Sequence, residues 1–237
     1  MSPLRYARLA GVLYLVIIVF GIFGEVGIRS TLVVPGDPVA TAGNLTSSEG
    51  LFRLGFFADS LMILCDIALA VLLYVLLAPV HKVVALMAMC FRLAQSAVLA
   101  LNLLHYHAAI LTLQGAGYSS VFEGTDAAAL ASFFLDLHAH GYDLGLLLFG
   151  VHCLLLGYLI VRSRYLPRLL GFLASAAGAA YLVGSYTRFL FPAHVEAVSP
   201  IYAVAIVSEV SLCLWLLVKG VNLERWKAMT QPLPAGD

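Results

Sequence analysis

The stretch FFLDLHAHGYDLGLLLFGVHCLLLGYLIVRSRYLPR, residues 133–168, decides the fold class of this chain. Its part from 133 to 161 is mostly apolar and exceeds the roughly 20 residues that a helix needs to cross a bilayer. Arg162 and Arg164 follow, and Pro167 closes a short connection before the next apolar run begins. Two apolar runs joined by a short basic turn predict two antiparallel membrane helices that are neighbours in the fold.

The composition of the whole chain agrees with this interpretation. Of its 237 residues 62% are hydrophobic and 11% are charged, with a formal net charge of zero and a mean hydropathy of +0.98. A soluble domain is about a quarter charged and just under half apolar. The composition therefore excludes a disordered chain, a small disulfide scaffold and a basic nucleic-acid binder. We expect the lipid bilayer as the main partner and no nucleic-acid partner.

Apolar runs long enough to span a membrane occur six times. They cover residues 9–28, 51–77, 83–113, 133–161, 166–191 and 201–218. We therefore predict an all-α polytopic membrane protein, a bundle of six transmembrane helices that forms a single integral membrane domain over 1–237. The loop VVPGDPVATAGNL, residues 33–45, has Pro and Gly breakers and a capping Asp37, which predict a short interfacial helix in the first outer loop.

The distribution of cations predicts the orientation. With the amino terminus in the cytoplasm, nine of the 13 Lys and Arg residues fall on the inner side: Arg5, Arg8, Lys82, Arg162, Arg164, Arg168, Lys219, Arg225 and Lys227. This positive-inside bias places both termini in the cytoplasm. The first apolar run is longer than the core of a signal peptide and has no close cleavage site, so we expect it to be retained as the first span.

Ionisable residues inside a span are costly unless they are paired or hydrated. Asp66 in the second span and Arg92 in the third lie about 17 and 14 Å from the cytoplasmic ends of their helices, at about 1.5 Å per residue. We predict a structural ion pair between them that fixes helix register, with a proton or substrate relay as the alternative role. The four cysteines, Cys65, Cys90, Cys153 and Cys213, fall inside spans without CxxC spacing and indicate neither a disulfide nor a zinc cluster.

The other polar residues inside spans are candidates for lining a polar cavity. They are Glu25, Asp59, Asn102, His105, His138, Asp143, His152 and Glu209. We predict two groupings, one of histidines with Glu25 and Asp59 toward the outer surface and one of His152 with Glu209 near the midplane. Histidines and carboxylates suit a metal ion or acid–base chemistry, and His105, His138 and Glu25 are the candidates for metal ligands. No HExxH, Walker A, GxGxxG or GxSxG motif is present, and no cofactor or oligomeric state is indicated.

Several strings of the sequence together resemble a known family. They are ARLAGVLYLVIIVFGIFGE, VVPGDPVATAGNL with SSEGLFRLGFFAD, FRLAQSAVLALNLL, and LHAHGYDLGLLLFGVHCLLLGYLIVRSRYLPRLLGFL. They look like the bacterial membrane-protein family named domain of unknown function 4386, from about residue 7 to 222. The resemblance implies a multi-pass protein of the bacterial inner membrane and brings no activity or catalytic residue with it. The resemblance also implies ten polar positions that are characteristic of the family, of which Asp66 and Glu209 lie outside the strings quoted above: Glu25, Arg53, Asp59, Asp66, Arg92, Asn102, His138, Asp143, His152 and Glu209.

Three functions remain open on the sequence. The first is small-molecule or proton-coupled binding and transport through a polar cavity that opens outward, lined by spans one to four and six. The second is an intramembrane enzyme that uses histidine and carboxylate groups, with or without a metal, on a lipid or another apolar substrate. The third is a structural or regulatory membrane partner whose polar residues only hold helices together. Whether the chain is an enzyme is left open by these residues.

Overall fold

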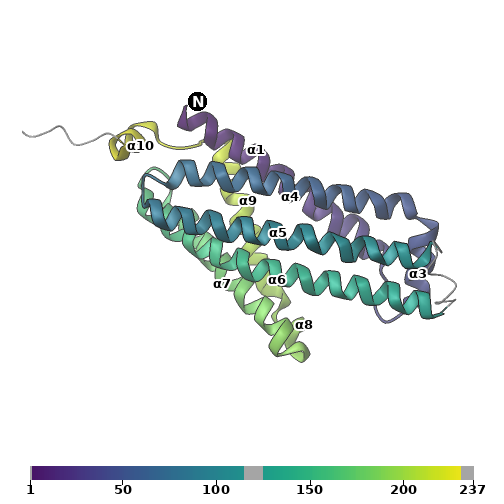
Figure 1. Ribbon diagram of the computed structural model, residues 1–237. Coiled ribbons are helices and arrows are strands. Elements are labelled where there is room, and N and C mark those ends of the chain that lie inside the picture. The colour runs from purple at the N-terminus through teal and green to yellow at the C-terminus, as the bar shows by residue number, and fades with distance from the viewer. Residues whose placement is uncertain (1, 115–124, 231–237) are drawn as a thin grey trace, which may run out of the picture. The chain divides into compact units, whose positions relative to one another are not determined.

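The computed structural model describes residues 2–114 and 125–230, and within these ranges the chain is helical with no strand (Figure 1). The main helices are α1 (Pro3–Ile22), α3 (Pro38–Ser47), α4 (Glu49–Leu77), α5 (Lys82–Leu113), α6 (Thr125–Ser163), α7 (Arg168–Leu190), α9 (Tyr202–Val218) and α10 (Leu223–Thr230). Short helical segments join them: the π-helix η1 (Phe23–Arg29), α2 (Ser30–Leu32), η2 (Pro192–His194), α8 (Val195–Val198) and η3 (Ser199–Ile201).

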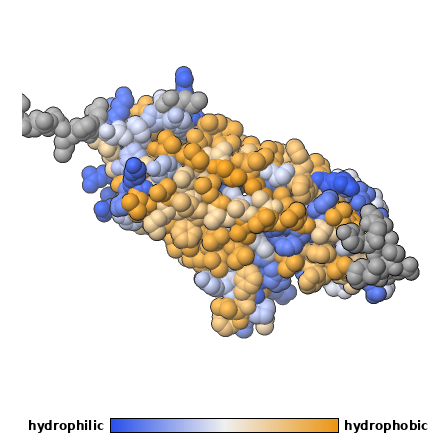
Figure 2. Space-filling view, viewed as in Figure 1, coloured by the Kyte–Doolittle hydropathy of each residue, from blue (hydrophilic) through white to orange (hydrophobic). Residues whose placement is uncertain are grey.

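Six helical stretches are long and apolar enough to cross a membrane. They are Pro3–Leu32, Glu49–Leu77, Lys82–Leu113, Thr125–Ser163, Arg168–Leu190 and Pro192–Val218. The predicted all-α polytopic fold with six spans is therefore confirmed. Large apolar side chains such as Leu64, Leu101 and Leu169 are about two-thirds exposed, and hydrophobic residues cover most of the face in view in Figure 2. Exposed apolar surface on this scale is what lipid contact requires.

The predicted helix in the first loop between spans is α3. Gly36 has a φ of 76° in the turn before it, a conformation that glycine adopts without strain. The Asp37 carboxylate accepts a hydrogen bond from the Ala40 backbone N–H at 2.9 Å, and Pro38 is the first residue of the helix. The Thr41 hydroxyl accepts from the Val34 N–H at 3.0 Å and fixes the turn against the helix. The N-cap that the sequence predicted at Asp37 is confirmed.

The chain divides into two compact units. Unit 1 comprises Met1–Leu15, Asp66–Gln95 and Leu146–Asp237, and unit 2 comprises Val16–Cys65 and Ser96–Gly145. The helices α1, α4, α5 and α6 each contribute residues to both units, so neither unit is one continuous stretch of sequence.

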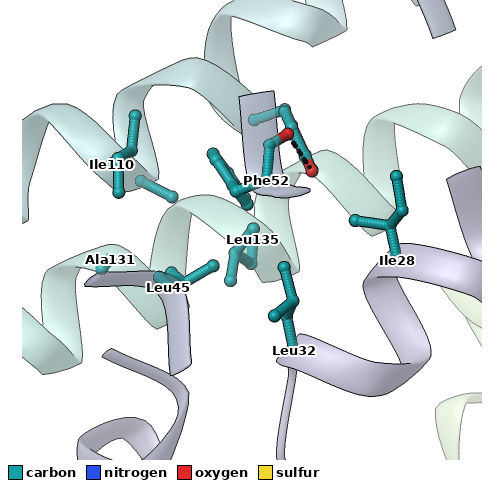
Figure 3. Close-up of a cluster of buried hydrophobic side chains, with 9 residues drawn as sticks. Ile28, Leu32, Leu45, Phe52, Ile110, Ala131 and Leu135 are labelled. Carbon is teal, nitrogen blue, oxygen red and sulfur yellow. Dashed lines mark hydrogen bonds between the residues drawn. The ribbon is translucent and has the colours of Figure 1, made fainter. Parts of the chain in front are cut away.

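Unit 2 is organised around an apolar core drawn in Figure 3. The residues labelled there point toward one another from η1, α2, α3, α4, α5 and α6 and belong to one buried cluster: Ile28, Leu32, Leu45, Phe52, Ile110, Ala131 and Leu135. The Tyr106 ring stacks on Phe52 with centroids 4.0 Å apart, and the Tyr106 hydroxyl donates to the Phe52 carbonyl at 2.9 Å. Because this cluster packs α3 against the spans, the interfacial helix is part of the core.

Unit 1 contains a close contact between α6 and α7. A methyl group at Gly157 would lie 2.6 Å from the Gly171 carbonyl oxygen, and one at Gly171 would lie 2.7 Å from the Gly157 carbonyl. Gly150 and Gly178 form a second reciprocal pair, seven residues away on each helix. A methyl group at Gly150 would lie 3.0 Å from the Gly178 carbonyl oxygen, and one at Gly178 would lie 2.7 Å from the Gly150 carbonyl oxygen. The two backbones therefore touch where only glycine fits. The helix α7 also lies beside α9 (Figure 1).

The end of unit 1 beyond α9 is tied to the turn between α6 and α7. The Tyr165 hydroxyl donates to the Leu76 carbonyl at 2.6 Å, and the Trp226 indole N–H reaches the same carbonyl at 3.3 Å. The Asn222 N–H donates to the Tyr165 carbonyl at 3.2 Å. Burial raises the pKa of the Tyr165 hydroxyl, so it remains a donor. The helix α10, which the sequence did not predict, is thus anchored to the Leu76 carbonyl by Trp226, and the residue before it is bonded to Tyr165.

Candidate functional site

An arginine at the end of the first span organises the polar residues of unit 2. The π-helix η1 places Glu25 and Arg29 one turn apart, and Arg29 Nε donates to Glu25 Oε2 at 2.8 Å. Arg29 Nη1 donates to Asp59 Oδ2 on α4 at 2.5 Å. The Glu25 side chain is 67% exposed and that of Asp59 is 3% exposed. The three charges therefore run from the surface of the unit into its interior.

Asp59 uses only one of its two carboxylate oxygens within the described part of the chain. Oδ2 receives Arg29, whereas Oδ1 is buried and no described residue donates to it. Gly24 lies directly against this oxygen, because a methyl group at position 24 would come within 2.8 Å of Oδ1. A buried carboxylate oxygen without a donor is costly. It marks a place where a further donor is needed.

His138 on α6 also has a buried acceptor atom to which no described residue donates. Its Nδ1 lies 3.1 Å from the Asn102 backbone carbonyl on α5. Because a carbonyl only accepts, Nδ1 carries the proton, and in the neutral ring Nε2 is then an acceptor. Nε2 is buried, and no described residue donates to it. His138 thus offers a second open acceptor.

Asn102 fixes the position of His138. Its Nδ2 donates to the His138 carbonyl at 2.7 Å, and its Oδ1 accepts from His105 Nδ1 at 3.0 Å. Gly141 gives Asn102 the space that it occupies, because a methyl group at Gly141 would overlap the amide. The Tyr106 ring lies 6.0 Å from the Arg29 guanidinium and 5.3 Å from the His138 ring. We refer to Arg29, Asp59, Asn102, Tyr106 and His138 as the unit 2 cluster.

Unit 1 holds a second polar network, around Arg92. Arg92 Nε and Nη2 donate to Asp66 Oδ1 at 2.9 and 2.5 Å. Arg92 Nη1 lies 3.1 Å from His152 Nε2, and His152 Nδ1 donates to the Ala88 carbonyl at 2.8 Å. The guanidinium also lies 5.4 Å from the Tyr14 ring centroid and 5.0 Å from that of Phe149. Arg92 is 1% exposed, and its charge is compensated by a carboxylate, an imidazole and two aromatic faces.

Glu209 lies in unit 1 and binds a tyrosine. The Tyr181 hydroxyl of α7 donates to Glu209 Oε1 on α9. The Phe149 ring lies 5.3 Å from Tyr181 and 5.5 Å from His152, so it contacts one ring of the Glu209 pair and one ring of the Arg92 network. A cavity of only ≈ 10 Å³ borders His152, which leaves space for about one water molecule. The arrangement is that of a packed interior.

The predicted site residues are thus divided between the two units. Glu25, Asp59, Asn102, His105, His138 and the buried Asp143 lie in unit 2, and Asp66, Arg92, His152 and Glu209 lie in unit 1. Within residues 2–114 and 125–230, no three His, Cys, Asp or Glu side chains are placed to hold a metal ion. The metal candidates His105, His138 and Glu25 therefore do not form such a ligand group there.

The sequence analysis missed the central residue of the unit 2 cluster. Arg29 was not among the candidate site residues, whereas it joins Glu25 to Asp59. Its spacing of four from Glu25 was the available signal, since residues four apart face each other on a helix. Tyr181 and Tyr14 were also missed, because a tyrosine in an apolar run has no signal that distinguishes it from core or lipid-facing residues.

Comparison with known proteins places the chain in a family. The sequence matches the family described as "Domain of unknown function (DUF4386)" over residues 9–220. The chain belongs to this family. It is also similar to an uncharacterized protein of Archaeoglobus fulgidus, with 31% identity over 168 residues that cover 69% of this chain and 82% of the archaeal protein. No solved structure matches the DUF4386 chain.

Proposed function

We propose that this protein binds and transports a small solute, and that the solute is held at the unit 2 cluster. The observation that carries the proposal is the pair of buried acceptors, Asp59 Oδ1 and His138 Nε2, to which no described residue donates. Buried polar atoms are nearly always hydrogen-bonded, so such atoms need a partner from outside the described chain. Both side chains belong to one cluster that is linked through Arg29 and Tyr106.

The chemistry of these two atoms defines the ligand class. A carboxylate oxygen and an imidazole lone pair both accept, so the ligand must donate at least two hydrogen bonds. Glu25 and Asp59 together carry two negative charges against the single positive charge of Arg29. The cluster therefore favours a cationic donor, and a small primary amine or ammonium ion meets both requirements. Gln95 Oε1 and Ser185 Oγ in unit 1 are also buried without a described donor, but these neutral side chains hold a cation less strongly than a carboxylate does.

Binding of labelled methylammonium to the purified full-length protein tests this proposal. We expect saturable binding that is at least about tenfold weaker in Asp59→Asn and in His138→Asn, because each removes one charge-assisted or buried hydrogen bond. His138→Asn retains a donor near the position of Nδ1 and deletes Nε2. The neutral donor acetamide should bind more weakly than methylammonium to the unchanged protein. Uptake into proteoliposomes then tests the transport step.

The control is His140→Asn. His140 is an exposed residue two positions along α6 whose Nδ1 bonds to the Asp136 carbonyl of its own helix. We expect this variant to bind methylammonium as the unchanged protein does. Absence of saturable binding in the unchanged protein would overturn the proposal, as would equal losses in His138→Asn and His140→Asn.

We also propose that the spans cross the bacterial inner membrane with both termini in the cytoplasm. An even number of spans puts the two ends of the chain on one side, and six spans are present. The positive-inside bias of the Lys and Arg residues favours the cytoplasm as that side.

A further inference from the structure

A cleft lined by arginines lies where α6 ends and α7 begins in unit 1. Two adjoining hollows of ≈ 330 and ≈ 730 Å³ share Arg164, Arg168 and Met229 as lining residues. Arg162 borders the smaller hollow, and Arg225 of α10 borders the larger one. We call the two together the arginine cleft. Its remaining lining residues are Val80, Val161, Leu166, Pro167 and Ala228.

The charge of the cleft is not compensated within the described part of the chain. All four arginines are exposed, no described acidic residue lines either hollow, and none of the four forms an ion pair with a described carboxylate. Four like charges around one cleft repel one another, and an anion in the cleft removes that repulsion. Arginine binds phosphate oxygens in bidentate geometry, which makes a phosphate group the best fit.

The cleft is held in shape by hydrogen bonds. Arg225 Nη1 donates to the Arg164 carbonyl at 2.9 Å, and Arg164 has a φ of 59°, which turns the chain sharply between the two spans. The Arg225 N–H donates to Asn222 Oδ1 at 3.1 Å and so begins α10. Together with the bonds of Tyr165 and Trp226 to Leu76, these contacts fix both walls of the cleft.

The position of the cleft identifies the source of the phosphate. Arg162 lies in the last turn of the span Thr125–Ser163, and Arg168 is the first residue of the span Arg168–Leu190. The arginines therefore lie at the level where lipid headgroups begin, and Val80, Val161 and Leu166 beside them suit the start of an acyl chain. We infer that the arginine cleft is a binding site for the headgroup phosphate of an anionic phospholipid.

Lipid binding to the full chain in detergent, measured by native mass spectrometry, tests the inference. The probes are phosphatidylglycerol and phosphatidylcholine with the same acyl chains. We expect the unchanged protein to bind phosphatidylglycerol at least about tenfold more tightly than phosphatidylcholine, because the zwitterionic headgroup of phosphatidylcholine has no net negative charge to offset the four arginines. The triple variant Arg162→Gln/Arg164→Gln/Arg168→Gln should lose this preference. It leaves the Arg225 side chain and the hydrogen bond to the Arg164 backbone carbonyl in place.

The matched control is Arg5→Gln/Arg8→Gln/Lys219→Gln. It removes the same charge from three exposed positions of the same unit that do not line the cleft. We expect it to keep the preference for phosphatidylglycerol. Equal losses in the two triple variants would overturn the inference, because they would indicate unspecific attraction. Displacement of phosphatidylglycerol by millimolar inorganic phosphate would also overturn it, in favour of a soluble anion.

A single substitution keeps the test decisive if the triple variant does not fold, as judged by gel filtration and its melting temperature. Arg168→Gln removes one exposed charge at the start of α7 and no hydrogen bond to a described side chain. We expect it to weaken phosphatidylglycerol binding about threefold and to leave phosphatidylcholine binding unchanged. No change in phosphatidylglycerol binding would contradict a role of Arg168 in the cleft and with it the inference.

Discussion

His138 and His152 lie on the same helix and are almost equally buried, at 5% and 1% exposure, yet their surroundings differ. Both donate from Nδ1 to a backbone carbonyl, so both present Nε2 as an acceptor in the neutral ring. Arg92 donates to Nε2 of His152, whereas Nε2 of His138 receives no hydrogen bond from the described chain. His152 thus completes the hydrogen bonds of the Arg92 network. His138 has one acceptor without a described donor, and this is the acceptor to which we propose that a ligand binds.

At the scale of single residues, the Arg92 network predicts a large loss of stability when one partner is removed. Arg92→Met leaves the Asp66 carboxylate buried without its cation, and we expect a decrease of about 3–5 kcal/mol in the free energy of unfolding. The double variant Asp66→Leu/Arg92→Met removes both charges and should recover most of that loss. Unfolding in mixed micelles measures both values.

Arg53→Met is the control for this prediction. Arg53 pairs with Glu49 at 2.6 Å, but both side chains are about half exposed. Water screens such a pair, so we expect a change of no more than about 1 kcal/mol. An Arg92→Met variant as stable as Arg53→Met would contradict a structural role for the buried pair.

Membrane energetics identified the candidate residues but not all of their partners. The cost of ions in hydrocarbon was sufficient to select Asp59, Asp66, Arg92 and His138 from the sequence. The partners Arg29 and Tyr181 were not selected. The spacing of four indicates the pair with Glu25, but Arg29 lies in a π-helical segment whose wider turn changes the direction of its side chain, so the spacing does not reveal the pair with Asp59. The lack of a described donor to Asp59 Oδ1 can be recognised only in a structure that places the side chains around it.

At the scale of helices, the contact between α6 and α7 shows why a small-residue pattern is a weak predictor. Gly141 and Gly145 form a GxxxG pattern, which favours the close approach of a neighbouring helix. In the structure Gly141 accommodates the Asn102 side chain, and the reciprocal backbone contact uses Gly150 with Gly178 and Gly157 with Gly171. Gly150 and Gly157 are seven apart and therefore share one face of α6. Which pair makes the contact depends on the partner helix, which one segment alone does not reveal.

We expect Gly157→Ala to destabilise the protein. Its methyl group would lie 2.6 Å from the Gly171 carbonyl oxygen and 2.9 Å from the Ser175 nitrogen, both of them backbone atoms that cannot move aside without shifting a helix. Overpacking of this kind costs about 1–3 kcal/mol. Thermal unfolding in detergent should show a lower melting temperature than that of the unchanged protein.

Gly50→Ala is the matched control. Gly50 is also helical, but a methyl group there would meet no atom within 4 Å. Because alanine is more favourable than glycine in a helix by about 0.5–1 kcal/mol, this variant should be as stable as the unchanged protein or slightly more stable. Equal melting temperatures for Gly157→Ala and Gly50→Ala would mean that α6 and α7 do not touch through their backbones.

At the scale of the whole molecule, composition and apolar run length were sufficient to predict the number of spans, because the bilayer sets a minimum length that no soluble helix has to meet. The ends of the spans were predicted less well. The fourth begins at Thr125 instead of 133. The sixth begins at Pro192 instead of 201, with short helical segments that no periodic pattern reveals. Residues near the membrane surface are constrained by both water and lipid, so hydropathy alone does not locate the point where a helix starts.

The six spans lead to a prediction about sidedness that tests the span count and the orientation separately. Thr46 is exposed on α3 after the first span, and Ala228 is exposed on α10 after the sixth. Five spans separate them, an odd number, so they must lie on opposite sides of the membrane whichever way the chain is inserted. The positive-inside bias favours the cytoplasmic side for Ala228. In intact cells we expect a membrane-impermeant maleimide to label Thr46→Cys, and to label Ala228→Cys only after the membrane is permeabilised.

The unsubstituted chain is the control, because its four cysteines all lie within candidate spans. Labelling of both positions from one side would contradict the number of spans, whereas the reverse pattern would keep that number and overturn only the orientation.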